Sequence, residues 1–483
     1  MNRNPIKLIA IVLAGVAPVA AQMYHQVNLV SDVSGLATVT DPLLINPWGV
    51  SFSPTSPFWV SNAGSSTSTL YAVTGSSAVS KAALEVHTPT PPSGQAFNSS
   101  SGFVVSQGGA SGPATFLFAG LNGTMFGWNS NVPPPVSPST QAILAATGTP
   151  SPVAYTGLAL GNRASGLFLY AANNIGGRID VFDKNFAQVS VPGGFIDPSL
   201  PAGALPFNVV NLGDSLYVTY SGLTAAVNVF DTDGHFLKRF ATGGTLLSPW
   251  GIALAPADFG KFSNALLIGN FNSGNPALGP GRISAFDAVS GAFLGLLEDT
   301  TGAPLSIDGL WTLTFGNGNN GGASNVLYFT AGIQNQLHGL FGNLAACGPV
   351  ISGASASPDL LWPPNNKMVP VSINYTVTGD CNAAPVASTL NVSSNKGTSA
   401  DWKVLDAHHV DLLADRAGNG DGRIYTITIS FTDSLGMSSS AKVTVTVAHD
   451  RGDRGDPGDQ GDQGDQGDQG DKGGKGKGKH GEE

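Results

Sequence analysis

The amino-acid sequence predicts an all-β protein: a six-bladed β-propeller, then a small β-sandwich, then a repetitive hydrophilic tail. Three observations lead to this prediction. A strand-and-turn unit recurs six times within residues 22–345, apolar and polar residues alternate through residues 346–449, and glycine stands at every third position from 452 to 473. The recurring units carry no helical apolar period, which favours strands throughout.

Composition indicates a folded, turn-rich chain. Of its 483 residues, 41% are hydrophobic and 11% are charged, so the chain can bury a large core and is not mainly disordered. It has 64 glycines and 32 prolines, as turns require. Lys and Arg number 22 against 32 Asp and Glu, a net charge of −10, which is the wrong sign for neutralising phosphate backbones. We therefore expect no nucleic-acid partner.

The first 21 residues have the pattern of a secretory signal peptide. Arg3 and Lys7 precede an apolar run over 8–16, and small residues lead to Ala21. A membrane anchor is the alternative, but the apolar run falls well short of the roughly 20 residues that a span needs. We expect cleavage before Gln22 and a secreted, extracytoplasmic protein, periplasmic or extracellular, with no transmembrane segment after cleavage.

The six recurring units predict the blades of the propeller. Each opens with a small residue and an apolar strand, followed by an aromatic-rich strand and a third strand. The openings lie 53, 55, 51, 43 and 58 residues apart, at Gly49, Gly102, Gly157, Asn208, Gly251 and Gly309. Such spacing suits four-stranded blades. A stack of β-sandwich domains is the competing interpretation, but it does not account for the repeated Pro-Trp-Gly. We expect residues 24–30 to supply the outer strand of the last blade.

Four segments of the first unit carry a resemblance to a known family. They are Val27–Asp32, Asn46–Gly49, Ser51–Pro54 and Phe58–Asn62. Together they resemble an uncharacterised family of exported bacterial proteins with NHL-like propellers, and the resemblance covers most of residues 22–345. It implies a propeller fold and export, and it implies no particular activity.

Residues 346–449 predict a separate β-sandwich, because strands with period-two alternation fill about 100 residues. The Trp-Pro-Pro-Asn at 362–365 and the Gly-Asp-Gly-Arg at 420–423 resemble the immunoglobulin-like (HYR-like) modules of secreted bacterial proteins. Cys347 and Cys381 are a candidate disulfide in an oxidising compartment, with two free thiols as the alternative. The resembling modules usually carry another cysteine where this chain has Ala387, which leaves Cys347 as the available partner for Cys381.

Residues 450–483 form a Gly-Asp-Xaa repeat tail that is acidic first and basic from Lys472 to Lys479. The period of three is typical of collagen, and a collagen-like tail would make the protein a trimer. Only Pro457 stiffens it, however, so a solvated, disordered tail is the alternative.

Candidate binding residues come from the mouth of the predicted central channel. The residues just before the six openings are Trp48, Ser101, Thr156, Phe207, Trp250 and Asp308. We take Trp48, Phe207, Trp250 and Asp308 as the candidate binding set. The three aromatic residues either pack between blades or offer stacking platforms for a sugar or an apolar ligand.

No catalytic residues and no cofactor are assigned. This mouth offers one carboxylate, whereas a hard cation needs several charged oxygen ligands. The sequence also contains no His-Glu-Xaa-Xaa-His and no Gly-Xaa-Ser-Xaa-Gly motif. Two fragments of calcium loops, at 231–234 and 419–422, lack the glutamate of an EF-hand and are interpreted as hairpin turns, with calcium binding as the alternative.

The sequence therefore predicts a non-catalytic binding or adhesion platform at the cell surface or in the extracellular matrix, with an unknown glycan or protein partner. The alternative is a metal-dependent propeller hydrolase or lactonase that acts at the channel mouth through Asp308 and Asn46.

Overall fold

A computed structural model describes residues 23–75, 77–200, 203–222, 225–271, 281–379, 385–416, 422–433 and 438–448. The chain divides into two compact units and first passes from one to the other after residue 350. The expected signal peptide, the expected tail and Cys381 lie outside the described residues. No helix among the residues described is long and apolar enough to cross a membrane.

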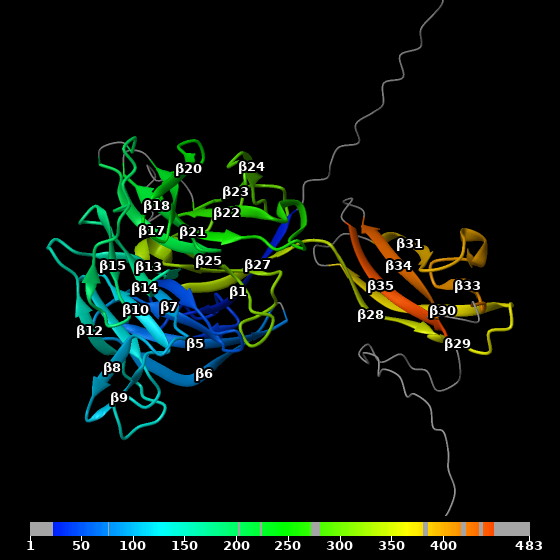
Figure 1. Cartoon of the computed structure of the whole chain (residues 1–483), viewed down its shortest axis with the longest axis horizontal. Helices are drawn as coiled ribbons and strands as arrows, with labels where there is room; N and C mark the ends of the chain where they lie inside the picture. The colour runs from blue at the N-terminus through cyan, green and yellow to red at the C-terminus, as the bar shows by residue number, and fades with distance from the viewer. Residues whose placement is uncertain are drawn as a thin grey trace, which may run out of the picture. The chain divides into compact units, whose positions relative to one another are not determined.

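Sheets of antiparallel strands follow one another along the first unit, with one parallel pair, β1 and β2, in the last (Figure 1). In the described part of the chain there are six of them, besides one two-stranded hairpin. The first three sheets consist of β3 (Pro47–Ser51), β4 (Phe58–Asn62), β5 (Thr67–Thr74) and β6 (Ala78–His87); β7 (Pro92–Phe97), β10 (Phe116–Gly120), β11 (Thr124–Trp128) and β12 (Ile143–Thr147); and β13 (Tyr155–Arg163), β14 (Gly166–Asn173), β15 (Arg178–Phe182) and β16 (Gln188–Val189).

The other three sheets repeat this order. They consist of β17 (Leu205–Leu212), β18 (Ser215–Ser221), β19 (Ala226–Asp231) and β20 (Phe236–Thr242); β21 (Pro249–Leu254), β22 (Ala265–Asn270), β23 (Ile283–Asp287) and β24 (Phe293–Leu296); and β25 (Leu310–Phe315), β26 (Leu327–Ala331), β27 (Leu340–Ala346), β1 (Tyr24–Ser31) and β2 (Val39–Thr40). Two short helical segments, η1 (Gly260–Phe262) and α1 (Ile333–Gln336), lie in the connections.

The sheets are arranged in a ring. We call β3, β7, β13, β17, β21 and β25 the first strands, because each is an edge strand and opens the run of consecutive strands that forms its sheet. Each first strand lies against the first strand of the next sheet, and β25 lies against β3. Sheets related in this way around a common centre are a β-propeller, so the predicted propeller is confirmed.

The N-terminal strand closes the ring. β1 pairs antiparallel with β27, with Tyr24 opposite Ala346 and Ser31 opposite Leu340. Residues 24–30, expected as the outer strand of the last blade, thus supply its fourth strand, and the two-residue β2 lies outside them. Strands from the two ends of the unit share one sheet, so the ring opens only if these ladder hydrogen bonds break.

The second sheet begins earlier than the sequence indicated. We expected its first strand at Ser101–Val104, but β7 takes that place. Residues 101–103 instead lead into a hairpin of β8 (Val104–Gln107) and β9 (Ala110–Pro113), inserted between β7 and β10. Both β7 and the segment Ser101–Val104 have a small residue before an apolar strand. The local sequence pattern alone therefore could not show which of them is the first strand of the sheet.

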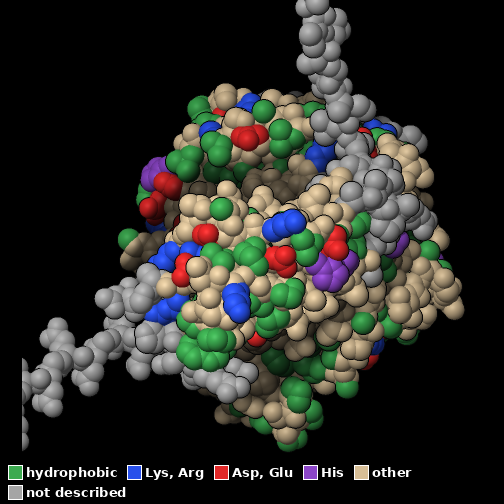
Figure 2. Space-filling model, turned by 90° about the vertical axis from the view of Figure 1, so that its right-hand side faces the viewer, with side chains coloured by type: hydrophobic (Ala, Val, Ile, Leu, Met, Phe, Trp, Pro, Cys, Tyr) green, Lys and Arg blue, Asp and Glu red, His purple; other side chains and the backbone are tan. Residues whose placement is uncertain are grey.

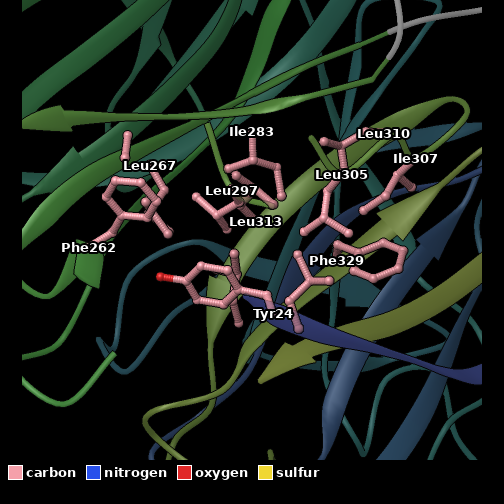
Figure 3. Packing of buried hydrophobic residues seen from close by; sticks show 14 of the residues in the cluster. Tyr24, Phe262, Leu267, Ile283, Leu297, Leu305, Ile307, Leu310, Leu313 and Phe329 are labelled. Atoms are coloured by element: carbon pink, nitrogen blue, oxygen red, sulfur yellow. The ribbon is translucent and has the colours of Figure 1, made fainter. Parts of the chain in front are cut away.

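The core of the first unit lies between neighbouring sheets. Figure 3 shows one such cluster, in which Tyr24 of β1 lies among side chains of the fifth and sixth sheets. The ring of Tyr24 is fully buried, 4.8 Å from that of Phe259, and its hydroxyl donates to the carbonyl oxygen of Phe259 at 3.2 Å. Burial raises the pKa of Tyr24 above its ordinary value. One side chain thus ties the closing strand to the adjacent sheet.

We expect Tyr24→Ala to lower the free energy of unfolding by about 3–5 kcal/mol, because it deletes a fully buried ring. Tyr24→Phe keeps the ring and loses only the hydroxyl bond, so its expected loss is about 1 kcal/mol. Urea unfolding followed by circular dichroism measures both. Equal losses in the two variants would show that ring packing does not secure β1.

A buried ion pair holds the loop before the fourth sheet. Asp197 accepts hydrogen bonds from Arg239 of β20, from Asn228 of β19 at 3.0 Å and from the Ser199 amide at 2.9 Å. Desolvation acts to raise the pKa of Asp197, but the bonds from Arg239 and Ser199 outweigh it, so this pKa lies below its ordinary value of 3.8. The charged carboxylate is therefore the form that stabilises the fold.

A lowered carboxyl pKa in the folded state contributes stability above the unfolded pKa, and this contribution is lost as the pH falls through the folded pKa. We expect Asp197→Asn to be less stable than wild type at pH 7 and to lose less stability than wild type between pH 5 and pH 2. Urea unfolding across this range tests it, with Asp258→Asn, an exposed carboxylate, as the matched control. Parallel curves for wild type and Asp197→Asn would contradict the assignment.

The second unit consists of two sheets that share one core. Its elements are β28 (Pro349–Ser357), β30 (Met368–Gly379), β33 (His409–Leu413) and β32 (Trp402–Val404) in one sheet; β29 (Leu360–Leu361), β35 (Ser438–Val447), β34 (Arg423–Asp433) and β31 (Pro385–Ser394) in the other; and the short helix η3 (Ser399–Asp401). Val371, Val410, Ile427 and Val445 are among the side chains buried together. Cys347 is buried at the end of the first unit, and its pairing with Cys381 stays a prediction.

Candidate functional site: the central channel

All six first strands change register with their partner at the same level. The shifts fall between Pro47 and Val50, Pro92 and Gln95, Tyr155 and Gly157, Pro206 and Asn208, Pro249 and Ile252, and Leu310 and Leu313. A bulge bends its strand and redirects a side chain. The repeated bulge therefore defines one layer of the ring, near the end where the first strands begin.

Six residues in the bulges form this layer: Trp48, Ser93, Thr156, Phe207, Trp250 and Trp311. The expected layer contained Ser101 and Asp308 in place of Ser93 and Trp311, so two of its six positions were wrong. Ser101 precedes the inserted hairpin, and Asp308 lies three residues before Trp311 in the sequence. The candidate carboxylate is thus replaced in this layer by an indole.

Five aromatic side chains fill this end of the channel. We call Trp48, Phe207, Trp250, Phe271 and Trp311 the tryptophan cluster. Trp311 is at its centre, stacked on Trp48 at 3.6 Å and on Phe271 at 3.8 Å between ring centroids. Trp250 meets Trp311 edge to face at 5.5 Å. Offset stacking and edge-to-face contacts are the favourable arrangements of aromatic rings.

The cluster is largely closed to solvent. Trp311 is 1% exposed, Trp250 4% and Trp48 6%, while Phe207 is half-buried. Of the two alternatives for the predicted aromatic residues, packing therefore accounts for Trp48 and Trp250. Sequence reasoning missed Trp311 and Phe271. Trp311 could have been found by aligning Leu-Trp-Thr at 310–312 with the two Pro-Trp-Gly openings.

Two indole N–H groups of the cluster donate to residues outside their own sheets. Trp250 Nε1 donates to the carbonyl oxygen of Thr156 at 2.9 Å, and Trp311 Nε1 donates to Asn46 Oδ1 at 3.3 Å. Among the described residues, Trp48 Nε1 is buried with no hydrogen-bond partner. Hydrogen bonds of this kind fix the orientation of each ring while its body stays apolar.

Directly after the layer residues, at the end of each bulge, the first strands approach one another closely. We call Gly49, Gly94, Gly157, Asn208, Gly251 and Thr312 the neck residues. A Cβ atom on Gly49 would lie 2.5 Å from the carbonyl oxygen of Ser93, and one on Gly251 would lie 2.5 Å from that of Trp311. Four of the six junctions therefore have space for glycine alone.

The other two neck residues join the strands by hydrogen bonds. Asn208 Nδ2 donates to the carbonyl oxygen of Trp250 at 2.8 Å, and Thr312 Oγ1 donates to that of Trp48 at 2.7 Å. The second bond links the sixth sheet to the first. At these two junctions the neck residue is not glycine, and a side-chain hydrogen bond joins the strands in place of direct contact between the backbones.

Asp308 and Asn46 contact the same turn, α1. The exposed Asp308 accepts a hydrogen bond from the Gln334 amide at 2.8 Å, and Asn46 Nδ2 donates to Gln336 Oε1 at 3.2 Å. Gln334, Asn335 and Gln336 have φ angles of 52°, 58° and 68°, in the left-handed region. Each such residue costs of order 1–3 kcal/mol, which these side-chain bonds help to offset.

Both proposed ligands of the alternative metal site are thus engaged with α1, Asp308 through a backbone amide and Asn46 through a side chain. In the described part of the chain, no three His, Cys, Asp or Glu side chains are grouped closely enough to hold a metal ion. The fragment at 231–234 closes the hairpin between β19 and β20, where the Asp231 amide donates to the His235 carbonyl at 3.1 Å. Its interpretation as a hairpin turn is confirmed, whereas residues 419–421 of the other fragment lie outside the described residues.

Beyond the neck, the channel widens into a cavity of about 500 Å³. All six first strands line it. Trp250 and Asn208 are buried at its inner end, and Leu254, which is 49% exposed, lies at its mouth. The residues that line it include no Asp, Glu, Lys, Arg or His. The propeller therefore has a channel that is filled at one end and hollow, without charge, beyond the neck.

Comparison with known proteins places the chain in a family of uncharacterised proteins. No model of a known protein family matches it. It is 31% identical over 335 residues to one uncharacterised protein of Acanthamoeba polyphaga mimivirus, covering 65% of this chain and 78% of that protein. A second uncharacterised mimivirus protein is 31% identical over 337 residues, covering 65% and 84%. The chain belongs to the same family as these viral proteins. These relatives do not show the expected bacterial NHL-like family, which stays a prediction.

Solved structures resemble the chain only distantly. The β-propeller domain of Cps50 (Swd1) from Myceliophteria thermophila has a TM-score of 0.36 and 11% identity, over 62% of this chain and 82% of that one. The PQQ-bound form of aldose sugar dehydrogenase from Streptomyces coelicolor has a TM-score of 0.38 and 14% identity, over 68% and 100%. The assignment of the fold therefore rests on the order of the sheets.

The close strand contacts at the neck predict that alanine lowers stability at one glycine of β13 and is tolerated at another. A Cβ atom on Gly157 would lie 2.0 Å from Asn208 Oδ1 and 2.8 Å from Asn208 Cα, whereas one on Gly161 would find its nearest atom, in the Tyr170 ring, at 3.1 Å. We expect Gly157→Ala to lower the free energy of unfolding by about 1–3 kcal/mol, because the clash includes backbone.

Gly161→Ala is the matched control on the same strand, with an expected change within about 0.5 kcal/mol. Chemical unfolding of both variants measures the difference. If Gly157→Ala is as stable as Gly161→Ala, the strands are not in close contact at the neck.

Proposed function

We propose that the protein is an exported, non-catalytic binding platform of the cell surface or extracellular matrix. In this proposal a six-bladed propeller binds the partner, an immunoglobulin-like module of the HYR-like kind follows it, and the Gly-Asp-Xaa tail is either disordered or collagen-like and trimerising. Export is inferred from residues 1–21 of the sequence. The partner is an unidentified surface glycan or protein.

The observation that carries the proposal is the tryptophan cluster. Five packed aromatic side chains occupy the end of the channel where the sequence predicted the mouth with its candidate binding residues. Trp311 stands there in place of the only carboxylate of the expected layer. A packed apolar core supplies rigidity and no group that donates or accepts a proton in a reaction.

Surface charge also suits a glycan or protein partner. On the face shown in Figure 2, described acidic and basic side chains lie interspersed among neutral ones. A nucleic-acid interface needs a continuous basic surface, and the net charge of −10 opposes one. Interspersed charges instead set register with a partner surface of mixed sign.

The rival function is the metal-dependent hydrolase or lactonase that uses Asp308 and Asn46. Asp308 already accepts from the Gln334 amide, and Asn46 is engaged by both Gln336 and Trp311. A cation bound between Asp308 and Asn46 would have one carboxylate ligand. It would also compete with the hydrogen bonds by which these two side chains support the strained turn α1. Hard cations bind where several charged oxygens converge.

Export and metal content test this proposal together. Expressed with its leader, the full chain is expected outside the cytoplasm with Gln22 as its first residue, as N-terminal sequencing would show. Mass spectrometry of the purified protein is expected to find no stoichiometric ion, and chelation should leave the melting temperature unchanged. Immobilised matrix and cell surfaces should retain the protein.

Asp308→Ala and Asp258→Ala form the matched pair for the metal measurement, since both carboxylates are exposed. A stoichiometric ion that is lost in Asp308→Ala and kept in Asp258→Ala would overturn the platform and support the hydrolase. Retention of the chain in the cytoplasm with its first 21 residues intact would overturn the proposed location.

A further inference from the structure

We propose that the channel cavity is a binding site for a small uncharged molecule that is rich in hydrogen-bond donors and acceptors, of the class of a neutral mono- or disaccharide. This inference deepens the proposed binding function and rests on it. The cavity, of about 500 Å³, falls in the range of roughly 300–1,000 Å³ that is usual for small-molecule sites.

The cavity wall is largely backbone. Its lining includes the unbroken runs 208–212 of β17, 250–254 of β21 and 312–315 of β25. Successive side chains of a strand point to opposite faces, so such a run can line a wall only along the edge of the strand. In each of these sheets, the first strand is the edge strand and is paired on one side.

An unpaired strand edge carries N–H and C=O groups that need partners. Two of these carbonyl groups already have partners. Asn211 Nδ2 donates to the carbonyl oxygen of Leu160 at 2.8 Å, and Asn208 Nδ2 donates to that of Trp250. The Val209 amide likewise donates to Asn208 Oδ1 at 2.8 Å, and we infer that a ligand or water meets other edge groups of the wall. A purely apolar ligand would displace that water without replacing its bonds, at a cost of about 1–3 kcal/mol for each group left unpaired.

A charged ligand is disfavoured for a different reason. The lining includes no ionisable side chain, so an ammonium, carboxylate or phosphate would leave water without meeting a counter-charge. That transfer costs far more than the burial of a neutral polar group. The wall thus selects for neutral molecules with several hydroxyl or amide groups.

Apolar side chains complete the fit to a sugar ring. Val50, Leu160, Leu212 and Leu313 lie among the backbone edges, and Phe97 and Phe315 also line the cavity. A saccharide presents hydroxyl groups around its rim and C–H groups on its faces, so it can satisfy both kinds of surface. The neighbouring amide of Gln95 is less adaptable, since Ser51 and Ser61 already hold it at 2.7 and 2.6 Å.

Isothermal titration calorimetry of the full-length protein tests the inference with defined probes. The neutral probes are glucose, maltose and N-acetylglucosamine, and the charged ones are glucuronate and glucosamine. We expect saturable binding of at least one neutral probe with millimolar or tighter affinity, and at least tenfold weaker binding of the charged probes.

Two leucines form the matched pair for locating the site. Leu254 at the cavity mouth is 49% exposed and Leu237 on β20 is 54% exposed, so lysine at either position keeps the fold. We expect Leu254→Lys to weaken binding of the neutral probe. Because the lysine supplies the missing counter-charge, the variant should also reduce the discrimination against glucuronate by at least tenfold. Leu237→Lys should behave as wild type.

The inference is overturned if no neutral probe binds, if charged probes bind equally well, or if both lysine variants change binding alike. Retention on matrix and cell surfaces separates this failure from that of the proposed function. If the protein is retained there but binds no neutral probe, the proposed platform function stands and the proposed channel site is overturned. A stoichiometric catalytic metal would overturn the platform function, whether or not the probes bind.

Discussion

Close contact between neighbouring first strands at the neck is the constraint on which the first unit depends. Four junctions are closed by glycine, where a Cβ atom would meet the backbone or the neck residue of the next strand, and two by the side chains of Asn208 and Thr312. Six sheets can surround a common centre only if every junction is made. The pairing of β1 with β27 then secures the closed ring along the last sheet.

The tryptophan cluster and the channel both follow from this layer. Each bulge turns one residue of a first strand toward the axis, and where that residue is aromatic it fills the end of the channel. Past the neck, the strands separate and their unpaired edges become the wall of the cavity. One geometric device therefore produces a rigid, apolar plug on one side and a hollow lined by neutral polar groups on the other.

Much of the ring could be predicted from the sequence, because strand alternation and the two Pro-Trp-Gly openings are local signals. The errors have physical causes. The hairpin at 104–113 carries the same pattern as a first strand, and Asp308-Gly309 imitates an opening three residues before Trp311. The central channel was predicted with the propeller, but the lining of its cavity could not be, because strand edges rather than recognisable side chains form most of the wall.

Amide hydrogen exchange, read by mass spectrometry, tests most directly whether the neck holds the propeller together. Neck segments of all six first strands should be the most protected of their sheets, more so than the outer strands such as β6, β16 and β24. They should also lose protection together as denaturant rises, since each junction depends on the next. Independent opening of individual sheets, with the outer strands protected as well as the neck, would contradict this account.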